Sequence, residues 1–71
     1  MRSPADALKD PRPGDVFGIG ASKLTVKEAG NNFRYNFDGW LCDAPLPHDP
    51  SNWRDWWAGL TSELEVLHVA P

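Results

Sequence analysis

The amino-acid sequence predicts a mainly β fold of five short strands, with one short helix before the last strand. Three observations favour this fold. Apolar and polar residues alternate over several short runs, which is the two-residue period of a half-buried strand. An Asp-Gly pair, Asp38 and Gly39, separates two of these runs and is typical of a tight hairpin turn. A proline-rich stretch then leads into a run whose aromatic residues recur with a helical period.

Residues 1–12 are expected to form a flexible or loosely packed N-terminal arm, because they are polar and contain the helix-breaking residues Pro4 and Pro11. Within this arm, Ser3 can cap a short turn of helix with Pro4 at its first position. The folded unit is expected over residues 13–71 as a single domain. It begins with the turn residues Pro13 and Gly14.

Four strands are expected in the first part of this domain, at residues 15–19, 23–29, 33–37 and 40–43, and a fifth at residues 63–69. In the fourth strand, alternation places Trp40 and Cys42 inward and Leu41 outward. The predicted core collects the inward residues of all five strands: Phe17, Leu24, Val26, Phe33, Tyr35, Phe37, Trp40 and Val66.

A short helix is expected over residues 50–58. Asp49 can cap its start, and Pro50 fits the first helical position, where a proline loses no hydrogen bond. Trp53, Trp56 and Trp57 follow a helical spacing and share an arc about 100° wide. Two alternatives stay open for this arc. Either its rings close the core, or at least one ring, that of Trp57, is exposed as an anchor for a partner.

The order of these elements is that of an SH3-like barrel, which lets few residues enclose a core and hides the strand edges. Residues 12–43 also resemble small SH3-like proteins encoded by phages and prophages. The resemblance lies in three stretches: Arg12-Pro13-Gly14-Asp15-Val16-Phe17, Leu24-Thr25-Val26, and Phe33-Arg34-Tyr35 with Asp38-Gly39-Trp40. It implies the barrel fold and an origin in a mobile element. Proteins of this source often block a host protein, anti-CRISPR proteins among them.

The chain has 71 residues and one cysteine, Cys42, so no disulfide within the chain can stabilise its small core. Self-association into a homodimer stays open as another source of stability. No stretch approaches the roughly 20 apolar residues of a membrane span, and no apolar run follows Arg2 as in a signal peptide. We therefore expect no membrane partner and a cytoplasmic location, in the host cell if a phage encodes the chain.

The net charge of −3 is unevenly distributed. Residues 1–37 carry six Lys and Arg against four Asp and Glu, whereas residues 38–71 carry one Arg against six Asp and Glu. An acidic surface repels phosphate groups and attracts basic protein surfaces. The expected partner is therefore a host protein with a basic patch.

The sequence predicts no enzymatic activity, no cofactor and no metal site. A catalytic triad would need Cys42 as nucleophile and His48 as base, with Asp43 or Asp49 orienting the base. However, a cysteine at an inward strand position is usually an inert apolar residue. Cys42, His48 and His68 are too few and too scattered for a structural zinc site.

The leading hypothesis is a non-enzymatic protein-binding module, an inhibitor or adaptor from a phage or a related element. Its binding surface is expected to combine exposed apolar residues with the acidic half of the chain: Trp53, Arg54, Trp57, Leu41, Asp43, Asp55 and Glu63. One alternative is a nucleic-acid-binding small barrel that uses Lys23, Lys27 and Arg34 on a basic hairpin face. Another is a structural or assembly component.

Overall fold

The computed structural model describes residues 2–44 and 53–71 of the chain. Its elements, in chain order, are helix α1 (Pro4–Lys9), strands β1 (Val16–Ile19), β2 (Ser22–Ala29), β3 (Phe33–Phe37) and β4 (Trp40–Asp43), helix α2 (Trp53–Leu60), the short 3₁₀ helix η2 (Thr61–Glu63) and strand β5 (Glu65–His68). The mainly β class, the five strands and the helix before the last strand are confirmed. The expected helix start at Asp49 and Pro50 lies outside the described residues.

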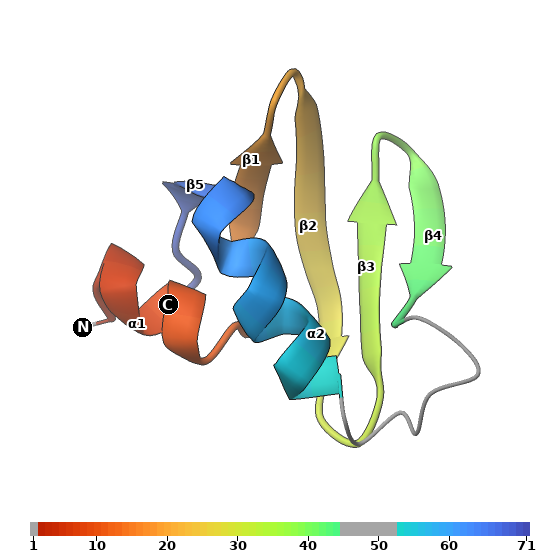
Figure 1. Cartoon of the computed structure of the whole chain (residues 1–71), viewed down its shortest axis with the longest axis horizontal. Coiled ribbons are helices and arrows are strands. Elements are labelled where there is room, and N and C mark those ends of the chain that lie inside the picture. Colours follow the sequence, from red (N-terminus) through yellow and green to blue (C-terminus); the bar gives the residue numbers. More distant parts are fainter. Residues whose placement is uncertain (1, 45–52) are drawn as a thin grey trace.

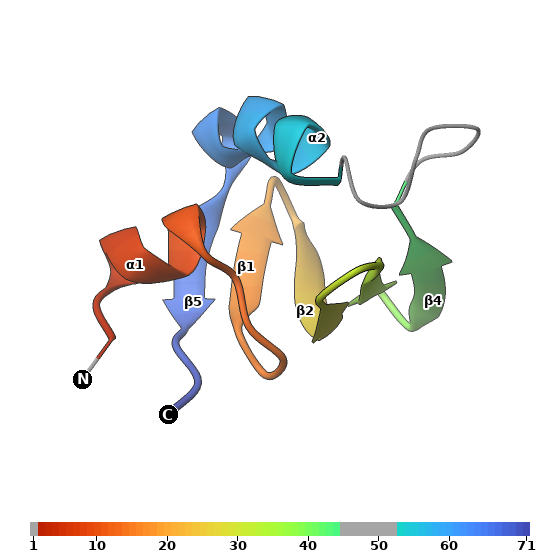
Figure 2. The same cartoon turned by 90° about the horizontal axis from the view of Figure 1, so that it is seen from below.

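The strands form one antiparallel sheet in the order β4-β3-β2-β1-β5 (Figure 1). β4 and β5 are its two edges, so the sheet is not closed into a barrel. Figure 2 shows α2 lying over one face of the sheet. In a closed barrel, the apolar face of each strand is covered by the strands opposite. In this open sheet, α2 covers the apolar face instead. None of the described helices is long and apolar enough to cross a membrane.

The hairpin between β3 and β4 has the geometry expected from its sequence. Asp38 and Gly39 form a two-residue connection and have φ values of 50° and 94°. Positive φ at both positions is the requirement of a type I′ turn, whose twist matches that of the strands. The turn places Phe37 directly opposite Trp40, and the pairing continues with Tyr35 opposite Cys42. The predicted register of this hairpin is therefore correct.

The core lies between the sheet and α2. Four of the predicted core residues, Phe17, Leu24, Val26 and Phe33, are buried there. Three others, Tyr35, Phe37 and Val66, are partly buried and pack against them. The assignment of Trp40 to the core is wrong, because its side chain is 77% exposed.

Residues 2–12, expected as a loose arm, pack closely against the rest of the domain. The predicted helical turn is present as α1, and Ser3 and Asp6 each accept a hydrogen bond from the other's backbone N–H. Ala7 is fully buried in the core cluster. The carbonyl oxygen of Leu8 accepts a hydrogen bond of 2.8 Å from the indole N–H of Trp57. The arm is thus part of the folded unit.

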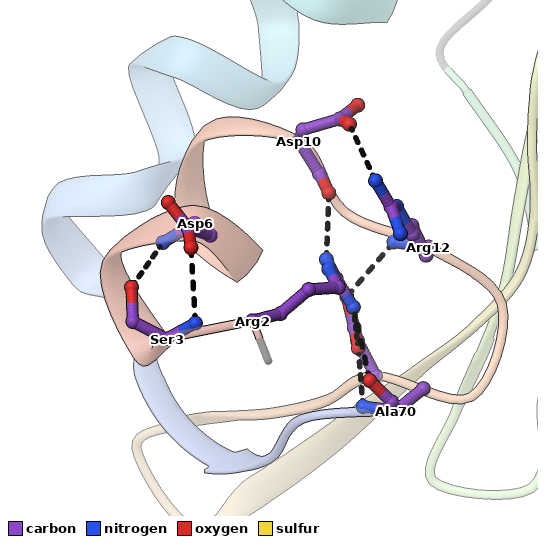
Figure 3. A network of polar contacts seen from close by, with 7 residues as sticks. Arg2, Ser3, Asp6, Asp10, Arg12 and Ala70 are labelled. Atoms are coloured by element: carbon purple, nitrogen blue, oxygen red, sulfur yellow. Dashed lines mark hydrogen bonds and ion pairs between the residues drawn. The ribbon is translucent and has the colours of Figure 1, made fainter.

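One buried carboxylate joins the two ends of the chain. Asp15, which is fully buried, accepts hydrogen bonds from both terminal nitrogens of the Arg2 guanidinium at 2.8 and 2.9 Å. It also accepts hydrogen bonds from the backbone N–H groups of Arg12 at 2.8 Å and Ala70 at 2.7 Å. Figure 3 shows Arg2 reaching between the Asp10 carbonyl and the Ala70 segment. The first and last residues of the fold are therefore held together at the end away from β4 (Figure 1).

Candidate protein-interaction surface

The tryptophans of α2 are core residues. Trp53 and Trp57 are each only 2% exposed. Their ring nitrogens are satisfied inside the protein, because the indole N–H of Trp53 donates to the Gly30 carbonyl and that of Trp57 to the Leu8 carbonyl, both at 2.8 Å. The expectation that Trp57 is an exposed anchor is therefore wrong, and Trp53 is equally inaccessible to a partner.

Phe33 explains why these rings turn inward. It lies at the centre of an aromatic cluster, 4.7 Å from the ring of Trp53 and 5.2 Å from that of Trp57, measured between ring centroids. Trp57 also meets Phe17 of β1 edge to face at 5.0 Å. Each large ring buries roughly 150–250 Å² of surface, so this cluster supplies much of the apolar burial that a short chain needs.

Trp56 lies at the border of this cluster. Its ring is half-buried and stacks on Tyr35 of β3, with centroids 5.6 Å apart and an interplanar angle of 25°. Burial raises the pKa of the Tyr35 hydroxyl, with further contributions from Cys42 and Asp43. The hydroxyl therefore stays protonated and neutral near pH 7. The described aromatic contacts of α2 reach β1 and β3, and none reaches β4.

Among the described residues, the two most exposed large apolar side chains lie on β4. Trp40 is 77% exposed, and its neighbour Leu41 is 58% exposed. Trp40 faces the helix side of the sheet, as alternation predicts, because it lies opposite Phe37. It is nevertheless exposed because β4 is an edge strand that the rings of α2 do not contact. We call Trp40 and Leu41 together the hairpin surface.

The predicted binding residues fall on two sides of the sheet. Trp53, Arg54, Trp57, Asp55 and Glu63 belong to α2 and η2, whereas Leu41 and Asp43 lie on β4. Leu41 and Asp43 lie opposite Asn36 and Arg34, and therefore point away from the helix side. The structure does not bring the predicted set together into one continuous surface.

The charged residues of the predicted binding surface differ in whether they already interact with another residue of the protein. Asp43 is held by Arg34, whose Nε donates to its carboxylate at 2.8 Å. Arg54 lies over the ring of Trp53, with its guanidinium carbon 4.3 Å from the ring centroid. Asp55 and Glu63 are exposed. The latter two remain available to attract a basic partner to the helix side.

The three basic residues considered for nucleic-acid binding are exposed, but acidic residues lie close to one of them, Arg34. Lys23 and Lys27 lie on β2 and Arg34 on β3. Arg34 is paired with Asp43, and its cross-strand neighbour is Glu28. Phosphate binding requires positive charge that is free to replace counterions. The structure therefore offers a weaker basic surface than the sequence alone suggested.

The residues considered for catalysis are only partly described. Cys42 is a free, half-buried thiol on β4, and its sulfur lies 3.7 Å from the Trp40 carbonyl oxygen. Asp43 is occupied by Arg34, and His48 and Asp49 lie outside the described residues. His68 is at the other edge of the sheet, on β5. Among residues 2–44 and 53–71, no group of three or more His, Cys, Asp and Glu could hold a metal ion.

Comparison with models of known families, with curated proteins and with solved structures gives no match for this chain. The resemblance of residues 12–43 to phage SH3-like proteins stays a prediction.

Proposed function

We propose that this domain is a non-enzymatic protein-binding module whose main contact is the hairpin surface. One observation carries the proposal: two adjacent residues of an edge strand, Trp40 and Leu41, are the most exposed large apolar side chains described. Single exposed apolar residues are ordinary. Because these two side chains lie on opposite faces of the same edge strand, they offer apolar contact on both sides of the sheet edge to a partner protein that packs along it.

The chemistry of Trp40 suits an anchor. Its ring offers a large apolar area with few rotatable bonds, and tryptophan is enriched among the interface residues that dominate binding energy. Trp40 contributes little to the core because it is 77% exposed. Its replacement should therefore cost binding and leave folding almost unchanged.

Charge on the helix side supports a basic partner. The chain carries a net charge of −3, and Asp55 and Glu63 are exposed on α2 and η2. Such charges mainly raise the association rate and orient the encounter, whereas apolar anchors set the lifetime of the complex. Asp55 and Glu63 would guide the partner, and the hairpin surface would hold it.

The narrower proposal is a cytoplasmic inhibitor or adaptor of SH3-like architecture, encoded by a phage or related element and acting on a host protein. Its support is the order of the elements and the resemblance of residues 12–43. Anti-CRISPR-like host takeover is one form that such an inhibitor would take.

The test captures proteins from a lysate of the cells that make this chain, using the wild type, Trp40→Ala and a matched control, Leu67→Ala. Leu67 is 47% exposed on β5, at the opposite edge of the sheet. We expect Trp40→Ala to weaken binding of the captured protein at least ~30-fold, which is about 2 kcal/mol, while Leu67→Ala binds like wild type. Melting curves of all three should agree. Equal capture by wild type and Trp40→Ala would refute the proposed surface.

A gel shift with single- and double-stranded nucleic acid separates this function from the nucleic-acid alternative. The proposal predicts no shift at physiological salt. A salt-sensitive shift that disappears when Lys23 and Lys27 are replaced by Gln would support nucleic-acid binding instead.

A further inference from the structure

Among the described residues, no strand pairs with the outer side of β4, so its backbone presents unpaired hydrogen-bonding groups there. The type I′ turn at Asp38 and Gly39 makes Phe37 and Trp40 a hydrogen-bonded pair, which exchange their N–H and C=O groups. Paired and free positions alternate along an edge strand. The N–H and C=O of Leu41 therefore point away from β3, toward the open edge of the sheet.

The side chains of β4 do not protect this edge. Natural proteins usually protect an edge strand with Lys, Pro or a covering element. β4 contains no Lys and no Pro, and its one charge, on Asp43, is held within the hairpin by Arg34 at 2.8 Å. Trp40 is exposed on the helix side of the edge, and Leu41 on the opposite side. An extended strand added here would gain backbone hydrogen bonds and an apolar contact on each face.

We propose that the occupant of this edge is β4 of a second copy of the chain, paired antiparallel so that two five-stranded sheets continue as one. The pair is centred on Leu41, which exchanges both backbone hydrogen bonds with the second copy's Leu41. Trp40 then lies opposite the second copy's Cys42. A two-fold axis perpendicular to the sheet keeps the helix side of one copy beside the helix side of the other.

The second copy fits because β4 is complementary to itself in this register. Leucine meets leucine on one face, and tryptophan meets cysteine on the other. Asp43 lies opposite the second copy's Gly39, so no like charges oppose each other. A register centred on Cys42 would instead place Leu41 opposite the second copy's Asp43. Alternation of apolar and charged residues therefore selects the register centred on Leu41.

The contact is small, because β4 has four residues. It falls below the ~1,200 Å² of a standard protein interface, so we expect a reversible dimer that forms as concentration rises. The dimer covers the hairpin surface, so it competes with any partner bound there. The inference concerns the purified chain alone, and it can fail while the proposed function stands.

The first experiment measures sedimentation of the purified chain from about 5 µM to 1 mM, a range suited to a weak interface. Wild type should pass reversibly from monomer to dimer. Leu41→Lys places two like charges opposite each other and should raise the dissociation constant at least ~10-fold. The matched control, Leu67→Lys on the other edge strand, should dimerise like wild type. Wild type that stays monomeric at 1 mM overturns the proposal, as does loss of the dimer only in Leu67→Lys.

The second experiment tests the register by mild oxidation. In the pairing centred on Leu41, the two Cys42 residues are offset by two residues along the strands, with Cα atoms about 8 Å apart, too far for a disulfide. Wild type should therefore stay uncross-linked. Trp40→Cys places its new thiol opposite the second copy's Cys42, with Cα atoms about 4.5 Å apart, and should give a disulfide-linked dimer. Cross-linking of wild type, or none in Trp40→Cys, overturns this register.

Discussion

Replacing Asp15 by Asn tests how much the buried carboxylate contributes to stability. Asp15 is fully buried and accepts four hydrogen bonds, two from Arg2 and one each from the N–H groups of Arg12 and Ala70. An asparagine has one acceptor oxygen, and its amide nitrogen would turn a donor toward these donors. Removing one partner of a buried ion pair typically costs about 3–5 kcal/mol, and we expect Asp15→Asn to lie in this range.

A matched pair on the surface provides the control. Arg34 and Asp43 are also joined at 2.8 Å, but their side chains are 46% and 62% exposed. Exposed pairs are worth about 0–1 kcal/mol, so Asp43→Asn should change the free energy of unfolding by no more than this. Urea unfolding of wild type and both variants at pH 7 makes the comparison. A cost below about 1 kcal/mol for Asp15→Asn would refute the assignment of a stabilising role.

The pH dependence gives an independent check. Burial alone would raise the pKa of the Asp15 carboxyl, but the hydrogen bonds from Arg2, Ala70 and Arg12 outweigh it and lower the pKa below its ordinary value of 3.8. A carboxyl whose pKa is lower in the folded state adds stability above its unfolded pKa, and this stability is lost as pH falls through the folded pKa. The stability difference between wild type and Asp15→Asn should be constant above about pH 5 and shrink below about pH 3.8. A difference that does not shrink as the pH falls below about 3.8 would contradict this account.

Five further substitutions test the core, the exposed edge strand and the hairpin turn. Trp57→Ala should cost about 3–5 kcal/mol in urea unfolding, whereas Trp40→Ala should change stability by no more than about 0.5 kcal/mol. Phe33→Ala should destabilise more than Phe37→Ala, because Phe33 is fully buried and Phe37 only partly so; equal thermal shifts would contradict this. Gly39→Ala should cost about 1–2 kcal/mol, because φ is 94° there and a Cβ meets no atom within 4 Å, so only backbone strain acts.

The strands and the hairpin could be predicted because their determinants are local. Alternation identifies a strand, and the Asp-Gly pair fixes the register in which Phe37 faces Trp40. The same pattern correctly placed Trp40 on the helix side of the sheet. It could not say whether anything covers that side, since coverage depends on where a distant helix lies. The predicted burial of Trp40 was therefore wrong because burial depends on tertiary packing, which the local pattern does not contain.

The helix tryptophans and the N-terminal arm show the same limit. The helical spacing placed Trp53 and Trp57 on one arc, and that arc does face the sheet. Their burial depends on Phe33, and on carbonyl acceptors at Gly30 and Leu8, 23 and 49 residues away in the chain. No short-range pattern encodes contacts of that separation. For the same reason, polar composition alone suggested a loose arm where the structure has a docked one.

The open edge at β4 follows from the size of α2 relative to the sheet. An eight-residue helix is about 12 Å long and about 10 Å wide. Five strands at about 4.8 Å spacing place the two edge strands about 19 Å apart. One such helix cannot cover the whole face. α1 contacts the β5 end, so in the described part of the chain the uncovered strand is β4, where Trp40 and Leu41 stand. Within the residues described, the chain has one short helix to cover this face of the sheet. Trp53 and Trp57 of α2 are therefore buried against the strands that it covers, and the side chains of Trp40 and Leu41 on β4 stay exposed for binding.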